Sequence, residues 1–390
     1  MNTQTTSAQT TPTATQHAAS LDDYIATGTA RALALNNRGP VRYSHDGQLH
    51  PEILEAYWAH GFYVFEGLID ADEVSSLRRD AEHLMDHAPV SQHADVDHAG
   101  RPAIKYDFKR PTFSYVKPLS DPWGGTPLLS GRHPTQMVQP TVETDAPEAV
   151  LFLINGMCQV MPSGLRVYGH PDILSIAASV NGEDFTPYND VLFVKPAGLG
   201  GSVAWHQDGV THWDSPDWDP GIHGFNFQVQ LYECTPRNAL WVMPGTHQQG
   251  RIDIKALVAA NQGSEQLPGA VPLICQPGDV TIVNRQALHC SFANTSPNLR
   301  VSLTFGFHRR ASVLGAQGAL SQASRETYDA QRIFERSRII ALAIDARAQH
   351  YPQQRRFDYA PFRGLEDEFR FNAETEQTIL RDYNLQDLSI

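Results

Sequence analysis

Short apolar stretches fill the middle and second half of the chain, and seven of them are strand candidates. They cover residues 190–195, 202–208, 225–233, 239–245, 279–284, 288–292 and 300–308, and clusters of Gly, Pro, Asn and Asp separate them. Several short strands at this spacing are typical of an all-β sandwich or barrel of the jelly-roll kind.

Two of these stretches alternate strictly between apolar and polar residues. Their apolar positions are Val301, Leu303, Phe305 and Phe307, and Phe225, Phe227, Val229 and Leu231; their polar positions are Arg300, Ser302, Thr304 and Gly306, and Asn226, Gln228, Gln230 and Tyr232. Successive strand residues point to opposite faces. A half-solvated antiparallel sheet produces this alternation, and so does a polar cavity inside a barrel whose apolar faces are covered by helices. The pattern leaves both interpretations open.

Helical patterns flank the strand region. Residues 51–87 predict a helix, a short strand at 62–65 and a second helix, for which Asp70 is the N-cap and Glu73 the capping-box partner. Residues 88–150 are rich in Pro, Gly, His and Asp, which indicates a long irregular excursion. Residues 321–349 and 374–387 again favour helices.

This order of elements predicts a mainly β fold with flanking helices. The length of 390 residues allows two or three domains. We expect a disordered tail at 1–20, one barrel domain at 21–320 with the insertion at about 88–150, and a helical extension at 321–390 that packs on the barrel. The tail lacks the features of a signal or transit peptide, and there is no apolar run long enough to cross a membrane, so we expect a cytoplasmic protein.

Charge and cysteine content limit the partners. The net charge of −13 argues against binding to nucleic acid or to an anionic membrane. A small-molecule substrate is therefore the expected partner, and the sequence does not indicate the oligomeric state. The four cysteines form no CxxC pair, so reduced thiols are expected. The 17 histidines make a metal site worth searching for.

The strongest chemical signal is the sequence Trp205-His206-Gln207-Asp208. Positions i and i+2 of a strand point to the same face, so His206 and Asp208 would present two metal ligands side by side. A lone HxD arises often by chance and needs a third ligand. His289 is the candidate: a hairpin centred on residues 294–297 would set it opposite Ser302, and would set Ser291 opposite Arg300. A capped surface hairpin, or a histidine satisfied in the core, would give the same sequence.

Two histidines and one carboxylate form the facial triad of non-haem Fe(II) oxygenases, which leaves coordination sites open for a 2-oxo acid and O₂. The distal carboxylate of 2-oxoglutarate needs a fixed donor, and a guanidinium supplies two parallel hydrogen bonds that a lysine cannot. Arg300 fits that task, and Ser302 adds a hydroxyl two positions along.

Four segments together resemble the phytanoyl-CoA dioxygenase (PhyH) family of Fe(II)/2-oxoglutarate-dependent oxygenases. They read HGFYVFEGLIDADEVSSLRRDAEHL, VLFVKPAGLGGSVAWHQD, PRNALWVMPGTHQQG and LHCSFANTSPNLR, and the resemblance covers about residues 55–310. It implies a double-stranded β-helix (jelly-roll, cupin-like) core. It also implies that His206, Asp208 and His289 bind Fe(II) and that Arg300 binds 2-oxoglutarate. Further co-substrate contacts would come from Ser291, Ser302, Lys195 and one of the two glutamines Gln228 and Gln230, with Gln230 the choice.

The resemblance further implies an enzyme that uses Fe(II), 2-oxoglutarate and O₂ to hydroxylate an unactivated C–H bond of a metabolite or natural-product intermediate, releasing succinate and CO₂. Asp208 argues against a halogenase, which has a small residue at that position. Two alternatives are a metal-dependent enzyme on the same barrel that does not use 2-oxoglutarate and a non-catalytic jelly-roll binding protein.

The remaining candidates concern histidines and the substrate. In the resemblance, His247 has a structural role, and His212 and His223 are loop or substrate-side residues rather than ligands. Five aromatic residues of the irregular excursion belong either to a substrate lid or to packing: Tyr106, Phe108, Phe113, Tyr115 and Trp123. Family members act on acyl-CoA, amino acids, ectoine-like solutes, phosphonates and natural-product intermediates, and fold-level likeness does not choose among these.

Overall fold

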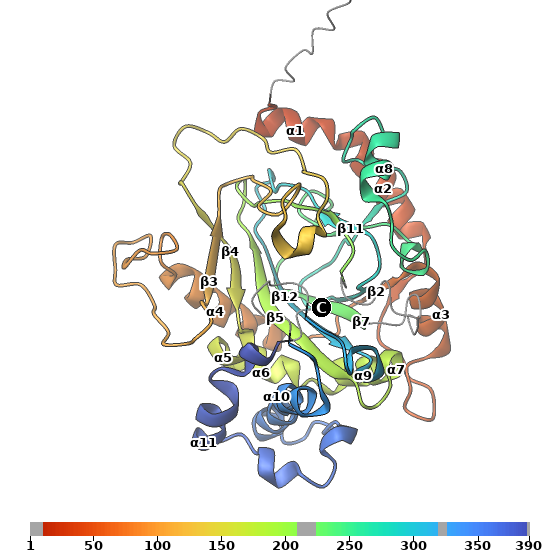
Figure 1. Ribbon diagram of the computed structural model, residues 1–390, viewed down its shortest axis with the longest axis vertical. Helices are drawn as coiled ribbons and strands as arrows, with labels where there is room; N and C mark the ends of the chain where they lie inside the picture. Colours follow the sequence, from red (N-terminus) through yellow and green to blue (C-terminus); the bar gives the residue numbers. More distant parts are fainter. Residues whose placement is uncertain (1–10, 209–223, 319–325, 388–390) are drawn as a thin grey trace, which may run out of the picture.

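The strands form two sheets in the computed structural model, which describes residues 11–208, 224–318 and 326–387 (Figure 1). The larger sheet has eight strands in the order β1-β2-β10-β7-β12-β5-β4-β3, and the smaller has four in the order β6-β11-β8-β9. The strands are β1 (Arg38–Gly39), β2 (Phe62–Phe65), β3 (Phe113–Val116), β4 (Val150–Asn155), β5 (Thr186–Lys195), β6 (Val203–His206), β7 (Gly224–Gln230), β8 (Trp241–Val242), β9 (Val271–Pro272), β10 (Val280–Asn284), β11 (His289–Ser291) and β12 (Arg300–His308). Each of the seven strand candidates therefore contains a strand.

Helices flank these sheets, as the sequence predicts. They are α1 (Ala14–Ser20), α2 (Asp22–Ala34), α3 (Pro51–His60), α4 (Ala71–His87), α5 (Met157–Val160), α6 (Pro162–Tyr168), α7 (Pro171–Asn181), α8 (Ile254–Ala260), α9 (Arg310–Val313), α10 (Ala330–His350) and α11 (Ala373–Thr375). Shorter turns are η1 (Leu128–Gly131), η2 (Thr246–Gln248), η3 (Ala360–Phe362), η4 (Glu366–Phe369), η5 (Glu376–Leu380) and η6 (Tyr383–Gln386). The predicted helix at 374–387 is thus broken into three short pieces.

The apolar faces of the central strands are covered by helices. Phe227 of β7 and Phe305 of β12 belong to one buried cluster together with Leu77 of α4, Leu165 of α6 and Ile340 of α10. All nine residues of β12 are buried. The polar faces of these strands therefore do not form an exposed sheet surface: Asn226, Gln228, Arg300 and Thr304 line a cavity. Of the two interpretations of the alternation, the polar cavity is correct.

Local signals place the helix ends. The side chain of Asp70 accepts a hydrogen bond from the Glu73 backbone N–H, as an N-cap should. The other half of the predicted capping box is absent, because the Glu73 carboxylate instead pairs with Arg347 of α10 at 2.6 Å. Helix α10 begins later than predicted, at Ala330, after Asp329 caps it. The Glu73–Arg347 pair fastens α10 to α4.

The predicted tail at 1–20 is wrong over residues 14–20, which form helix α1. Thr13 and Gln16 make a reciprocal capping box at its start, and His17 is buried. A short polar helix of this kind has little intrinsic stability, so a Thr- and Ala-rich sequence resembles a tail when its tertiary contacts are not visible. Residues 1–10 lie outside the described part of the chain.

The predicted hairpin between residues 289 and 302 is also wrong. Strand β11 pairs with β6 and β8 in the smaller sheet, whereas β12 pairs with β5 and β7 in the larger one. The connection between them crosses from sheet to sheet. Asn294 holds it there, since its side-chain amide donates to the carbonyl oxygens of Lys195, Pro196 and Asn298.

Two further expectations concern thiols and membranes. The four cysteines are buried and unpaired. Among the described residues, no helix is both long and apolar enough to span a membrane.

Candidate metal centre

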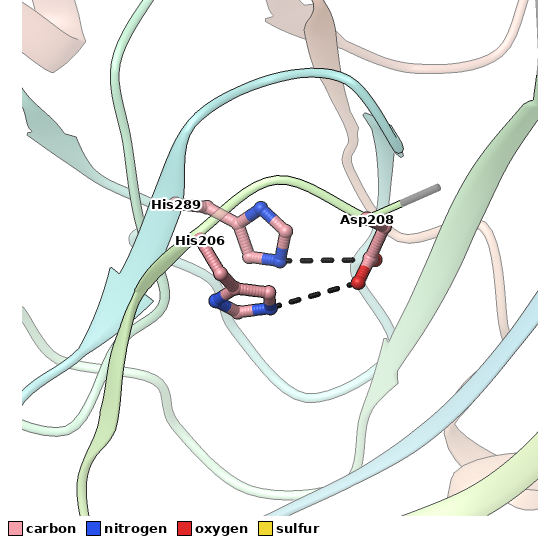
Figure 2. A group of neighbouring side chains, drawn as sticks. All are labelled: His206, Asp208 and His289. Carbon is pink, nitrogen blue, oxygen red and sulfur yellow. Dashed lines mark ion pairs between the residues drawn. The ribbon is translucent and has the colours of Figure 1, made fainter. Parts of the chain in front are cut away.

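The two sheets bring His206, Asp208 and His289 together (Figure 2). His206 ends β6 and faces His289 of β11 across an antiparallel pair, so both imidazoles project to the same side. Their ring centroids are 4.0 Å apart. Asp208 Oδ1 lies 3.6 Å from His206 Nε2, and its Oδ2 lies 3.9 Å from His289 Nε2. One ligand atom from each residue falls within 4.8 Å of the others, a spacing that could hold a metal ion.

Backbone contacts orient both imidazoles for ligation. His206 Nδ1 is 2.8 Å from the Ala204 carbonyl oxygen, and His289 Nδ1 is 2.8 Å from the Ala287 carbonyl oxygen. A carbonyl oxygen only accepts, so Nδ1 carries the proton in each ring and Nε2 keeps its lone pair. Both Nε2 atoms point toward the Asp208 carboxylate. This is the arrangement that metal-ligating histidines commonly adopt, so the residues fit a divalent metal ion.

The electrostatics favour the protonation states that a metal ion needs. Burial lowers the pKa of His206 well below its usual value, and the neighbouring His289 lowers it further. Burial also lowers the pKa of His289. For Asp208 burial acts in the opposite direction, but Arg132 and Arg285 outweigh it and lower its pKa to about 2. Neutral imidazoles beside an ionised carboxylate are the ligand forms required for binding.

Two residues that the sequence analysis did not assign hold the Asp208 carboxylate. Arg132 Nη1 lies 2.7 Å from Oδ1, and Asn226 Nδ2 donates to Oδ2 at 2.8 Å. Asn226 lies on the polar face of its strand, so the alternation gave a signal for it. Arg132 lies in the irregular excursion, where no periodic pattern marks it.

Arg300 lines the same cavity, which has a volume of about 320 Å³. Its side chain is buried. Nη1 donates to the Asn238 carbonyl oxygen at 3.1 Å and Nη2 to Gln228 Oε1 at 3.0 Å, while Nε is buried without an acceptor among the described residues. The guanidinium is therefore held in place and still has free donors.

The other predicted co-substrate contacts divide into two groups. Lys195 and Ser291 line the cavity, and Lys195 Nζ donates to Ser291 Oγ at 2.9 Å, which links the two sheets. Gln230 and Ser302 are buried but are not among the cavity-lining residues, whereas Gln228 is. Gln230 and Ser302 are paired across β7 and β12, and Arg300 Nη2 lies 3.5 Å from Ser302 Oγ. The cavity wall therefore favours Gln228, not Gln230, as a co-substrate contact.

The irregular excursion and the C-terminus complete the cavity wall. Of the five aromatic residues considered for a lid, Trp123 lines the cavity and the other four pack in the hydrophobic core: Tyr106, Phe108, Phe113 and Tyr115. Arg110 and Asp387 also line it and form an ion pair with each other. A cavity wall built from segments so distant in sequence has no local sequence signal.

None of the other histidines in the described part of the chain joins the triad. His247 Nε2 lies 3.0 Å from the Trp58 carbonyl oxygen, outside the cavity wall, which agrees with a structural role. His133 is a histidine that the sequence analysis did not consider; its buried ring lies 4.2 Å from that of His206. His212 and His223 lie outside the described residues.

Comparisons with known proteins include a family match to the region that holds the candidate metal centre. The model of the phytanoyl-CoA dioxygenase (PhyH) family matches residues 136–302. Phytanoyl-CoA dioxygenase 1 of Oryza sativa subsp. japonica is 30% identical over 120 residues, which are 29% of this chain and 41% of that protein. The match therefore spans less than half of that relative.

Two of the solved structures to which this chain is similar share little sequence with it. The structure of EctD from S. alaskensis with 2-oxoglutarate and 5-hydroxyectoine is 19% identical, with 74% of this chain and 88% of that chain covered and a TM-score of 0.49. For AviO1 from Streptomyces viridochromogenes Tue57 the identity is 17%, the coverage 66% and 94%, and the TM-score 0.46. The resemblance that the motifs predict is confirmed over residues 136–302 by the match to the phytanoyl-CoA dioxygenase (PhyH) family model, and this span contains His206, Asp208, His289 and Arg300.

Proposed function

We propose that this chain is an Fe(II)/2-oxoglutarate-dependent dioxygenase built on a double-stranded β-helix (jelly-roll) core. It would hydroxylate an unactivated C–H bond of a small-molecule metabolite or natural-product intermediate and release succinate and CO₂. The observation that carries the proposal is the triad His206, Asp208 and His289, whose ligand atoms converge in the cavity that Arg300 also lines. The match to the PhyH family model supports it.

In this proposal His206, Asp208 and His289 hold the ferrous ion. Bound there with 2-oxoglutarate and O₂, the iron supplies the oxidising power that removes a hydrogen from the substrate. Asn226 keeps one carboxylate oxygen of Asp208 oriented through its 2.8 Å hydrogen bond. Three ligands from the protein leave the remaining coordination positions for small molecules.

Arg300 would bind the side carboxylate of 2-oxoglutarate. A guanidinium has five N–H groups. Two of those on Arg300 are used by the Asn238 carbonyl and by Gln228, and Nη2 also makes a long contact of 3.5 Å with Ser302 Oγ. Nε–H and one N–H of Nη1 are therefore unused, and a carboxylate would take the second Nη2 donor in place of Ser302. A bidentate pair with a carboxylate needs two parallel donors, which Arg300 can provide without losing its own anchors.

The apolar part of the wall would exclude water. Trp123 packs edge-on against Phe152 with ring centroids 5.2 Å apart, and both line the cavity. A dry cavity protects a reactive oxidant from side reactions. This division into a polar co-substrate side and a partly apolar substrate side is what a hydroxylase of small molecules requires.

The test is an anaerobic titration of the Fe(II)-loaded protein with 2-oxoglutarate, followed by visible spectroscopy and by measurement of bound iron. We expect about one iron per chain, as three protein ligands imply, and a metal-to-ligand charge-transfer band that saturates with 2-oxoglutarate. His289→Ala should lose the iron and the band, whereas His247→Ala should keep both. Absence of the band in protein that has bound iron would refute the proposal.

A further inference from the structure

Arg132 is a charged residue of the cavity that the proposed function leaves without a task. It follows η1 and lines the same cavity as the three candidate ligands. Its Nη1 lies 2.7 Å from Asp208 Oδ1, and its side chain is only 14% exposed. Its Nε is buried and has no acceptor among the described residues. The guanidinium therefore lies beside the candidate metal position with a donor to spare.

The backbone before Arg132 is strained. Leu129 and Ser130 have φ angles of 49° and 58°, in the left-handed region that side chains with a Cβ rarely adopt, and Gly131 follows with φ 68°. Leu129 itself lines the cavity. Strain of this kind persists only where surrounding contacts hold it, and it gathers at binding sites. The turn thus presents Arg132 to the cavity at an energetic cost, which suggests a task in binding.

The charges of the cavity indicate that Arg132 would share its anionic partner, Asp208, with the metal ion once the proposed cofactors are bound. The other charged residues of the described wall, apart from the two histidines, are Arg110, Lys195, Asp208, Arg300 and Asp387. Arg110 pairs with Asp387. The pKa of Lys195 lies well below its usual value, mainly because the side chain is buried and secondly because of the charge of Arg300.

The bound groups account for the remaining charges. Arg300 would neutralise one carboxylate of 2-oxoglutarate. A divalent ion would be neutralised by Asp208 together with the other carboxylate. Arg132 then shares its one anionic partner, Asp208, with the metal ion, and its side chain is only 14% exposed. A mostly buried charge that shares its partner is poorly compensated, so a ligand that supplies one negative charge is stabilised there.

We propose that the substrate is a small monocarboxylate with an apolar body, and that Arg132 binds its carboxylate; this inference rests on the proposed dioxygenase function. A single planar guanidinium matches a carboxylate in both charge and geometry, whereas a phosphate dianion would need a second cation. The apolar body would contact Trp123, Leu129 and Phe152, which line the same cavity. Because Arg132 contacts a metal ligand, carbons adjacent to the carboxylate would lie closest to the metal.

The test uses acid and amide pairs of the same shape: phenylacetate with phenylacetamide, 3-phenylpropionate with 3-phenylpropionamide, and hexanoate with hexanamide. Binding is measured by calorimetry on protein saturated with Mn(II) and 2-oxoglutarate without O₂, so that Arg300 is occupied. We expect at least one acid to bind about 10- to 100-fold more tightly than its amide, the range for one hydrogen bond to a charged group.

Three variants assign the difference to Arg132. R132Q should remove the preference for the acid over its amide. Because Arg132 also holds the Asp208 carboxylate, acid and amide are compared within the variant, at Mn(II) and 2-oxoglutarate concentrations that saturate it. R132K, which keeps the charge and loses the fork, should retain part of the preference. R251Q is the matched control, because Arg251 is an exposed arginine that does not line this cavity; it should behave like the wild type.

The outcomes separate this inference from the proposed function. If 2-oxoglutarate binds but no acid binds more tightly than its amide, including the case in which no probe binds, the carboxylate site is wrong and the dioxygenase proposal stands. The carboxylate site is likewise wrong, and the dioxygenase proposal stands, if R132Q still binds the acid more tightly than its amide. If 2-oxoglutarate does not bind to the metal-loaded protein, the proposed function itself fails. The wild-type comparison needs no variant, so it decides the matter even if R132Q does not fold.

Discussion

Replacing Arg300 with glutamine is the sharpest test of how the cavity binds its co-substrate. Arg300 begins β12 and is paired in register with Lys195 of β5, so its backbone is fixed by the larger sheet. Its side chain is anchored by Gln228 and by the Asn238 carbonyl. Glutamine has nearly the same polarity but neither the positive charge nor the fork of donors. The substitution therefore removes the carboxylate-binding group and leaves the strand intact.

The magnitude follows from the donors that remain on Arg300. Nε–H is unused, and the second N–H of Nη2 makes only a 3.5 Å contact with Ser302 Oγ. A carboxylate that replaces that contact can accept two parallel charge-assisted hydrogen bonds. Each such bond contributes about 1.5–3 kcal/mol. Two of them predict a loss of about 3–6 kcal/mol, which corresponds to a 10²- to 10⁴-fold rise in the Kd of 2-oxoglutarate. R300K should fall between the wild type and R300Q, because it keeps the charge and loses the second parallel bond.

The assay is the anaerobic titration with 2-oxoglutarate, carried out on wild type, R300K and R300Q with matched iron content. Arg300 has no contact with the triad among its hydrogen bonds, so bound iron should be equal in all three proteins. A Kd for R300Q within about threefold of the wild type, in folded protein with full iron, would correspond to less than 1 kcal/mol. That result would refute the assignment of Arg300 and direct the search to Lys195.

Three further predictions concern stability and the identity of the ligands. Glu73→Gln breaks the buried ion pair with Arg347, whose second hydrogen bond is 3.0 Å long. The substitution should lower the free energy of unfolding by about 3–5 kcal/mol. Thermal melting measures this loss, and an unchanged Tm would contradict it. Burial raises the pKa of Glu265 from 4.5 to about 8. Between pH 4.5 and 8 the folded chain therefore keeps a proton that the unfolded chain has lost, so the free energy of unfolding falls as the pH rises through this range. Denaturant titrations at several pH values should therefore show the wild type losing stability relative to E265Q, and a pH-independent difference would be evidence against it. His247→Ala removes the contact with the Trp58 carbonyl and should cost about 1–3 kcal/mol of stability with iron content retained; loss of iron in metal analysis would reverse the structural assignment.

The triad could be predicted from the sequence because its geometry is local. His206 and Asp208 are two positions apart at the end of one strand, and strand alternation alone puts them together. His289 was found through its motif rather than through the correct topology. It faces His206 across β11 and β6, whereas the sequence analysis placed it in a hairpin with β12. The hairpin argument therefore brings the three residues together, as the structure does, but through the wrong strand pairing.

The error has a physical cause. A turn rich in Asn, Ser and Pro predicts a tight hairpin when its flanking strands are assumed to pair. Whether they pair depends on which other strand competes for the edge. Here β5 and β7 occupy both sides of β12, and the Asn294 amide ties the turn to the carbonyls after β5. Competition of this kind involves residues about 100 positions away and leaves no trace in the local pattern.

A chain with a net negative charge can still bind an anionic substrate, and the way it does so predicts how the affinity depends on salt. The net charge of −13 acts over the surface, where salt screens it beyond about 8 Å at physiological ionic strength. Arg132 is 14% exposed and Asp208 7%, so a carboxylate bound there interacts through a medium that salt penetrates poorly. Its affinity should therefore change little between 50 and 500 mM NaCl. A steep fall would mean that surface cations such as Arg251, and not the buried guanidinium, attract the ligand.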